Sequence, residues 1–211
     1  MPLQNRVTPH GDIVFSSARG TLMGNRGCLH DAARRLGRRR WTTRSWVICL
    51  LSFGGRRREL MRPGYYTELF FLDEATALAA GHRPCAECQR DAWRRFAACW
   101  SAAAGFDPRS VRAADLDRSL HAARVDRRRG KVTYTARFGD LPDGALFVAE
   151  EGTFLKWRGT ARPWSLDGYG PAVALAGESE VTVLTPRPTV EALRRGYAPA
   201  VHATVGIGSS P

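Results

Sequence analysis

The chain has 211 residues, 44% of them hydrophobic, so it can form an apolar core in one large domain or two small ones. It contains no run of 18 apolar residues and begins with no apolar leader, and its five cysteines do not suit a secreted disulfide framework. We therefore expect a cytoplasmic protein with no membrane partner. The net charge of +12 favours an anionic partner.

The N-terminal part of the chain predicts short strands arranged around a hairpin. Residues 41–53 are apolar on both alternating faces, which indicates a buried strand, and Gly54-Gly55 then marks a turn. The elements expected up to residue 72 are a strand at 12–16, a Gly-rich loop at 18–26, an Arg-rich helix at 30–37, the strand at 41–53, a returning strand at 56–61 and a third strand at 65–72.

The next segment carries clear helix signals. Asp73 can cap a helix over 74–80, and Gly81 suits its C-terminal end. A second helix is expected over 87–104. Its stripe of Trp93, Phe96 and Trp100 is typical of a core face, and Cys99 is expected to be buried there.

The remainder predicts short helices within 107–128 and then a compact antiparallel unit. Its expected elements are strands at 132–138, 145–149, 153–157, 171–175 and 180–184, a helix at 189–195 capped by Thr189, and a disordered tail at 206–211. We therefore predict an α+β protein divided into a zinc-binding module at 1–106, a helical connector at 107–137, a small β domain at 138–205 and the tail.

Cys85 and Cys88 are the strongest functional signal. Two thiols three positions apart, after a proline and at the start of a helix, can hold one metal ion; the same spacing also occurs in redox dithiols, but no hydrophobic strand leads directly into this pair. A tetrahedral zinc site needs two further ligands. Cys49 in the predicted hairpin is one candidate. His30 or Cys28 is the other, with His30 preferred for its reach, while His82 could hydrogen-bond a thiolate.

Residues 70–89, which run from Phe70-Phe71-Leu72-Asp73 through Ala79-Ala80-Gly81 to Arg83-Pro84-Cys85-Ala86-Glu87-Cys88-Gln89, resemble the zinc half of the Ada-type methylphosphotriester-repair domain. The resemblance is close over about 20 residues and loose over about 45. In that family four cysteines bind zinc, and one thiolate accepts a methyl group from a DNA phosphotriester. Cys49 corresponds to the first cysteine of the family's other pair, but the second position is Phe53 in this chain.

The function predicted from these features is a zinc protein that contacts nucleic acid, with DNA favoured. Residues 1–62 contain 13 Arg and three acidic residues, a gradient that codon bias alone would not produce. The candidate phosphate contacts are Arg26, Arg38, Arg39, Arg40, Arg56, Arg57, Arg58 and Arg83. Two alternatives are a nucleic-acid enzyme, acting by thiolate methyl transfer or by hydrolysis, and a zinc-stabilised protein-interaction module. Because Cys49 is expected to be covered and His30 would weaken the thiolate charge, we expect no methyl transfer.

Overall fold

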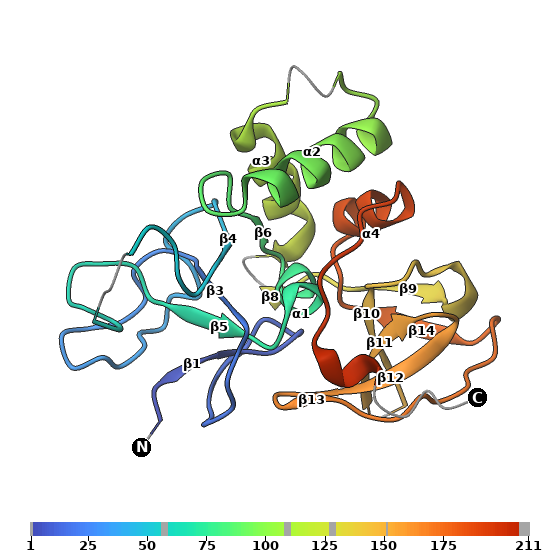
Figure 1. Ribbon diagram of the computed structural model, residues 1–211, viewed down its shortest axis with the longest axis horizontal. Helices are drawn as coiled ribbons and strands as arrows, with labels where there is room; N and C mark the ends of the chain where they lie inside the picture. Colours follow the sequence, from blue (N-terminus) through green and yellow to red (C-terminus); the bar gives the residue numbers. More distant parts are fainter. Residues whose placement is uncertain (1, 56–58, 108–110, 127–129, 151, 207–211) are drawn as a thin grey trace.

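The computed structural model of the protein describes residues 2–55, 59–107, 111–126, 130–150 and 152–206, and these form an α+β structure, as predicted (Figure 1). Within these ranges the strands form two six-stranded sheets and one two-stranded hairpin. The four α-helices are α1 (Glu74–Ala79), α2 (Arg90–Ala104), α3 (Ala113–Arg124) and α4 (Arg187–Arg194). In the described part of the chain, no helix has the length and apolar character needed to cross a bilayer.

The N-terminal sheet has the order β2-β1-β5-β3-β4-β6 and is mixed, because β1 pairs with β5, and β4 with β6, in parallel. Its strands are β1 (Gln4–Val7), β2 (Ile13–Phe15), β3 (Leu22–Asn25), β4 (Val47–Cys49), β5 (Leu69–Phe71) and β6 (Arg83–Pro84). The expected strand at 12–16 is therefore confirmed in β2, and the strand at 65–72 is confirmed only in its last part.

Three N-terminal predictions differ from the structure. The segment 30–37 is not a helix, because the Asp31 carboxylate accepts the backbone N–H groups of Ala33 and Arg35 and closes a turn. The long strand at 41–53 is reduced to β4, and the segment expected to be a Gly-rich loop supplies β3. Gly24 permits this pairing, since a Cβ there would lie 2.1 Å from the Val47 carbonyl oxygen. Residues 59–61 form no strand, and 56–58 lie outside the described residues.

The C-terminal sheet is antiparallel and has the order β13-β12-β11-β10-β14-β9. Its strands are β9 (Tyr134–Arg137), β10 (Leu146–Ala149), β11 (Gly152–Trp157), β12 (Thr160–Ser165), β13 (Gly168–Tyr169) and β14 (Glu180–Val183). A hairpin of β7 (Val125–Asp126) and β8 (Gly130–Lys131) precedes it, and two 3-10 turns lie at Phe138–Asp140 and Ala203–Gly206. The strand expected at 171–175 is absent apart from one bridge between Val173 and Ala161. The N-cap position of α4 is occupied by Pro186, without a side-chain hydrogen bond, rather than by Thr189 as predicted.

Helix α1 joins the two sheets. All six of its residues are buried, and it contacts both β5 and β10. As predicted, Asp73 caps the helix: its Oδ1 accepts the Thr76 N–H at 2.8 Å, while Oδ2 accepts Tyr169 Oη–H at 2.8 Å. The buried Glu74 carboxylate accepts the Ala200 N–H at 2.8 Å and the Tyr197 hydroxyl. The C-terminal unit is thus fastened to the first turn of the helix that leads into the cysteines.

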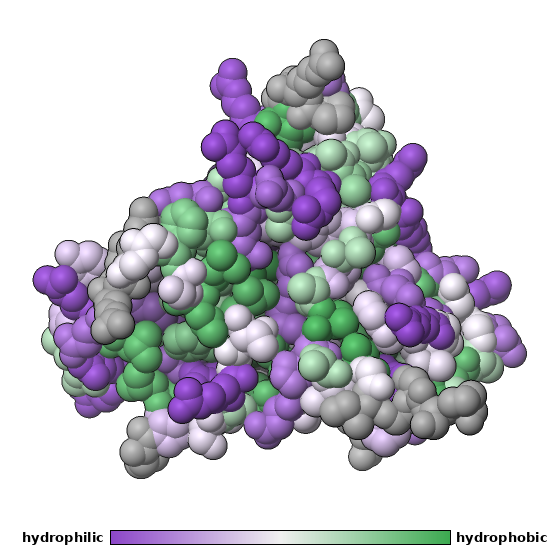
Figure 2. Space-filling model, in the orientation of Figure 1, coloured by the Kyte–Doolittle hydropathy of each residue, from purple (hydrophilic) through white to green (hydrophobic). Residues whose placement is uncertain are grey.

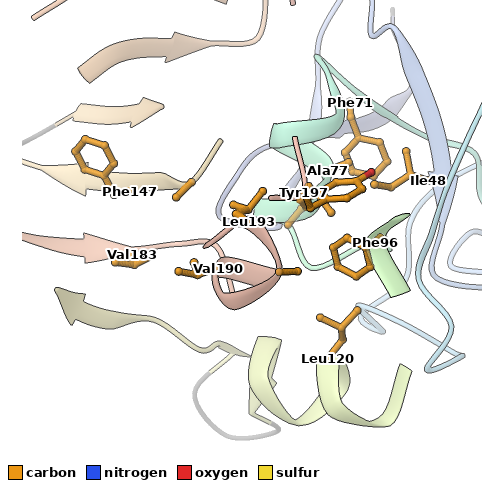
Figure 3. Packing of buried hydrophobic residues seen from close by; sticks show 14 of the residues in the cluster. Ile48, Phe71, Ala77, Phe96, Leu120, Phe147, Val183, Val190, Leu193 and Tyr197 are labelled. Atoms are coloured by element: carbon orange, nitrogen blue, oxygen red, sulfur yellow. The ribbon is translucent and has the colours of Figure 1, made fainter. Parts of the chain in front are cut away.

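One hydrophobic cluster includes residues of both sheets and of the helices α1 to α4 (Figure 3). Phe96 of α2 packs edge-on against Tyr197, with ring centroids 5.0 Å apart, and Ile48 and Phe71 bring the N-terminal sheet into the same cluster. Trp93 is half-buried beside Phe96 and Trp100, which confirms the core face predicted for α2. The cysteine-bearing segment therefore rests on a core shared with the rest of the described chain.

Candidate metal centre

Strand pairing brings Cys49 to the Cys85–Cys88 segment. Strand β6 lies parallel to β4, and the Ile48 carbonyl oxygen accepts both the Cys85 backbone N–H and the Gln89 side-chain amide at 2.9 Å. This carbonyl directly precedes Cys49. These two hydrogen bonds hold Ile48, and with it the next residue Cys49, beside the Cys85–Gln89 segment.

Cys49, Cys85 and Cys88 form the group suited to a metal ion among the described residues. Their Sγ atoms lie within 4.8 Å of one another, all three are half-buried, and none forms a disulfide. This spacing is short enough for three thiolates to bind one ion. The coarse prediction of a metal site at these three residues is therefore matched by the geometry.

Hydrogen bonding and burial shift the pKa values of these three thiols. A hydrogen bond with the Cys49 thiol, supported by backbone N–H groups of Cys88 and Glu87, lowers the pKa of Cys85 to about 5. The same hydrogen bond raises the pKa of Cys49, and burial raises that of Cys88. Cys85 is therefore the thiol of the three that loses its proton most readily, and a metal ion would favour deprotonation of all three.

The three thiols line an open cleft of about 570 Å³. Its other walls are mainly apolar, and Leu50, Leu51, Phe53 and Leu60 are each more than a third exposed there. Hydrophobic residues also gather over the N-terminal sheet in Figure 2. Cys49, the last residue of β4, is half-buried and lines the cleft, so the neighbouring side chains do not cover it completely, contrary to the expectation.

The structure does not bring Cys28 or His30 to this group. Both ring nitrogens of His30 have other partners: Nδ1 lies 2.7 Å from Thr67 Oγ1, and Nε2 lies 3.2 Å from the Arg62 carbonyl oxygen. Cys28 is exposed, and its thiol points to the His30 carbonyl oxygen at 3.7 Å. Their loop is closed by the turn at Asp31 and does not fold over the cysteines. His82 contacts no thiolate either: its Nε2 accepts Arg26 Nε–H at 3.4 Å.

The predicted phosphate contacts fall into three groups. Arg38, Arg39 and Arg40 are exposed on one loop, and Arg56, Arg57 and Arg58 lie outside the described residues. The prediction that Arg83 contacts phosphate is wrong. Arg83 is buried and forms a bidentate ion pair with Asp117, at 3.0 and 2.8 Å. The Arg83 guanidinium is therefore not accessible to a phosphate backbone. Arg26 is likewise buried, in a small cavity described below.

Two residues in or near the site could not be identified from the sequence. Glu68, a buried acid that lines the cleft, accepts the Met61 N–H at 2.7 Å, and nothing in the chain pattern marks it. Asp117, the partner of Arg83, lies 34 residues away on α3. Comparisons of the chain with models of known families, with curated proteins and with solved structures each found no match.

Proposed function

We propose that the protein binds one zinc ion through Cys49, Cys85 and Cys88 and that it contacts nucleic acid, preferably DNA. The observation that carries the metal proposal is the approach of three sulfur atoms to within 4.8 Å of one another. Soft thiolate ligands select zinc over magnesium or calcium, and a zinc knuckle of the spacing Cys-x-x-Cys supplies two of them.

A three-thiolate site leaves one tetrahedral position for another ligand. Among the described His, Cys, Asp and Glu residues, no fourth member joins the group. The three thiols line the cleft, so water or a group from a bound partner could complete the coordination there. Structural zinc sites are normally closed by four protein ligands, whereas sites that act on a substrate keep one position open.

Contact with nucleic acid is supported by charge. The 13 Arg of residues 1–62 outnumber three acids, and Arg38, Arg39 and Arg40 extend from one loop into solvent. Exposed Arg side chains can pair with phosphates, and their binding is weakened by salt because counterions return to the polymer.

A second candidate function is methyl transfer to Cys49, as the resemblance to the Ada-type domain implies. Access to Cys49 from the cleft favours it, and the proposed site lacks the histidine ligand that would reduce thiolate charge. In this step the Cys49 thiolate forms an S–C bond, the C–O bond of a methylphosphotriester breaks, and the phosphodiester leaves with the electron pair.

Metal analysis of matched cysteine variants tests the zinc site. We expect one zinc per chain in the natural protein and loss of zinc in Cys85→Ser, together with reduced stability. Cys28→Ser and Cys99→Ser remove the same atom elsewhere and should keep full occupancy. Full occupancy in Cys85→Ser, or loss in Cys28→Ser, would contradict the assignment.

Binding and transfer need separate assays. Fluorescence anisotropy with duplex DNA should show affinity that falls steeply with salt and is reduced when Arg38 and Arg39 are both replaced with Gln. Affinity that is flat with salt would favour a protein-interaction role. Mass spectrometry after incubation with DNA that carries methylphosphotriesters tests the second function. A methyl group on Cys49 supports transfer, and an unmodified zinc-loaded protein rejects it.

A further inference from the structure

A separate cavity of about 140 Å³ lies beside the C-terminal end of α1, where the β1–β2 turn meets the β7–β8 hairpin (Figure 1 shows β8 next to α1). It shares no lining residue with the cleft at the cysteines. One acidic residue, Asp12, contributes to its lining. Its basic residues are His10, Arg26, Arg40, Arg124 and Lys131. The lining therefore has a strong excess of positive charge.

Two of these arginines are buried with unused donors. Arg26 is 2% exposed; its Nη1 donates to the Gly11 carbonyl oxygen at 2.8 Å, but Nη2 has no hydrogen-bond partner within the described chain. Arg124 is 1% exposed and donates through Nη1 to the Gly81 carbonyl oxygen at 2.7 Å. Its Nε, like Nη2 of Arg26, has no hydrogen-bond partner among the described residues. Buried donors of a charged group are normally satisfied, so these atoms indicate a ligand that accepts hydrogen bonds.

Acidic side chains compensate the buried cations of this cavity only in part: the Asp12 carboxylate acts on Arg26 and Lys131, and the Asp117 carboxylate acts on Arg124. Arg26, Arg124 and Lys131 take no part in the ion pairs formed among the described residues. Both guanidinium carbons instead pack on the Trp46 ring, 4.2 and 3.9 Å from its centroid. Burial and neighbouring positive charges lower the pKa of Arg26 and Arg124 to about 9, and the pKa of Lys131 to about 7. A bound anion would relieve this repulsion.

We propose that this cavity is a binding site for a phosphate group. Arginine forks and a lysine ammonium donate to several oxygens at once, which suits a tetrahedral phosphate. Arg40 is exposed at the cavity, so a phosphate could enter as the free ion or at the end of a nucleic acid chain. The site does not depend on the metal centre.

Isothermal titration with inorganic phosphate tests the proposal, with sodium chloride at equal ionic strength as the reference. We expect saturable binding and a higher unfolding temperature in phosphate. Arg40→Gln should weaken binding about tenfold, the size of one charge-assisted hydrogen bond. Arg94→Gln removes the same charge from an exposed position that does not line the cavity, and should leave phosphate affinity unchanged. Both residues are exposed, so both variants should fold.

Absence of saturable phosphate binding, or equal losses in the two variants, would overturn the site. Competition with a short oligonucleotide identifies the source of the phosphate. If the 5′-phosphorylated form displaces inorganic phosphate and the 5′-hydroxyl form does not, the site takes the end of a nucleic acid chain. If neither form competes while Arg40-dependent binding persists, the ligand is free phosphate. Salt-sensitive DNA binding without any phosphate binding would keep the proposed function and reject this cavity.

Discussion

Replacement of Arg83 with Met should destabilise the protein strongly and should not affect nucleic-acid contact directly. Arg83 Nε and Nη2 donate to the two carboxylate oxygens of Asp117 at 3.0 and 2.8 Å, and both side chains are only 5% exposed. Ser45 Oγ also donates to Asp117 at 2.6 Å. Methionine fills a similar volume but leaves the carboxylate buried without its cation.

The magnitude follows from desolvation of the remaining charge. Removing one partner of a buried pair lowers the free energy of unfolding by about 3–5 kcal/mol. The double variant Arg83→Met with Asp117→Leu removes both charges and should recover most of that loss. Arg118→Met is a matched control on the same helix as Asp117, because the Arg118–Asp115 pair at 3.2 Å is largely exposed and should contribute less than about 1 kcal/mol.

Urea unfolding of the zinc-loaded proteins, followed by circular dichroism, gives the free energy of unfolding of the natural protein and of each of the three variants. Arg83 precedes Cys85 by two residues, so the single variant should also lose zinc at a lower chelator concentration. A loss below about 1 kcal/mol in Arg83→Met would refute the buried-pair argument. Weaker DNA binding by the folded double variant would restore Arg83 as a phosphate contact.

Three further predictions test the surroundings of the two sites. Gly81 has φ of +94°, and a Cβ there would lie 2.6 Å from Arg124 Cδ, so Gly81→Ala should lower the free energy of unfolding by about 1–3 kcal/mol; an unchanged urea midpoint would contradict this. Tyr169→Phe removes the hydroxyl that donates to Asp73 and should reduce stability by about 1 kcal/mol in thermal unfolding, whereas a more stable variant would argue against that bond. The pKa of Lys131 is lowered to about 7, so between pH 7 and its ordinary 10.5 the unfolded chain binds more protons than the folded one. Stability in phosphate-free buffer should therefore rise with pH across this window, and Lys131→Met should reduce the slope; an equal slope in both proteins would refute it.

The sequence alone determined the local elements next to the metal site. Asp73, the apolar helix and Gly81 are signals carried within nine residues, and the structure has α1 with the predicted cap. Cys85 and Cys88 are three positions apart in the chain, so their proximity needs no tertiary information. The core face of α2 also follows from its spacing.

Only the tertiary structure decided which residues join these elements. Cys49 was predicted as a partner of the cysteine pair from a hairpin with 56–61, but it is the parallel pairing of β4 with β6 that brings it there. Arg83 was predicted to contact phosphate because the chain is basic, but it forms an ion pair with Asp117, which lies 34 residues further along the chain. Cys28 and His30 satisfy the ligand pattern but lie in a loop held elsewhere by Asp31 and Thr67.

The physical reason is the difference in range of the interactions. Caps, turns and helical periodicity depend on hydrogen bonds and packing within a few residues, so the sequence states them directly. Strand partners, buried ion pairs and cavities depend on which distant segments share one core, because burial and desolvation are properties of the assembled fold.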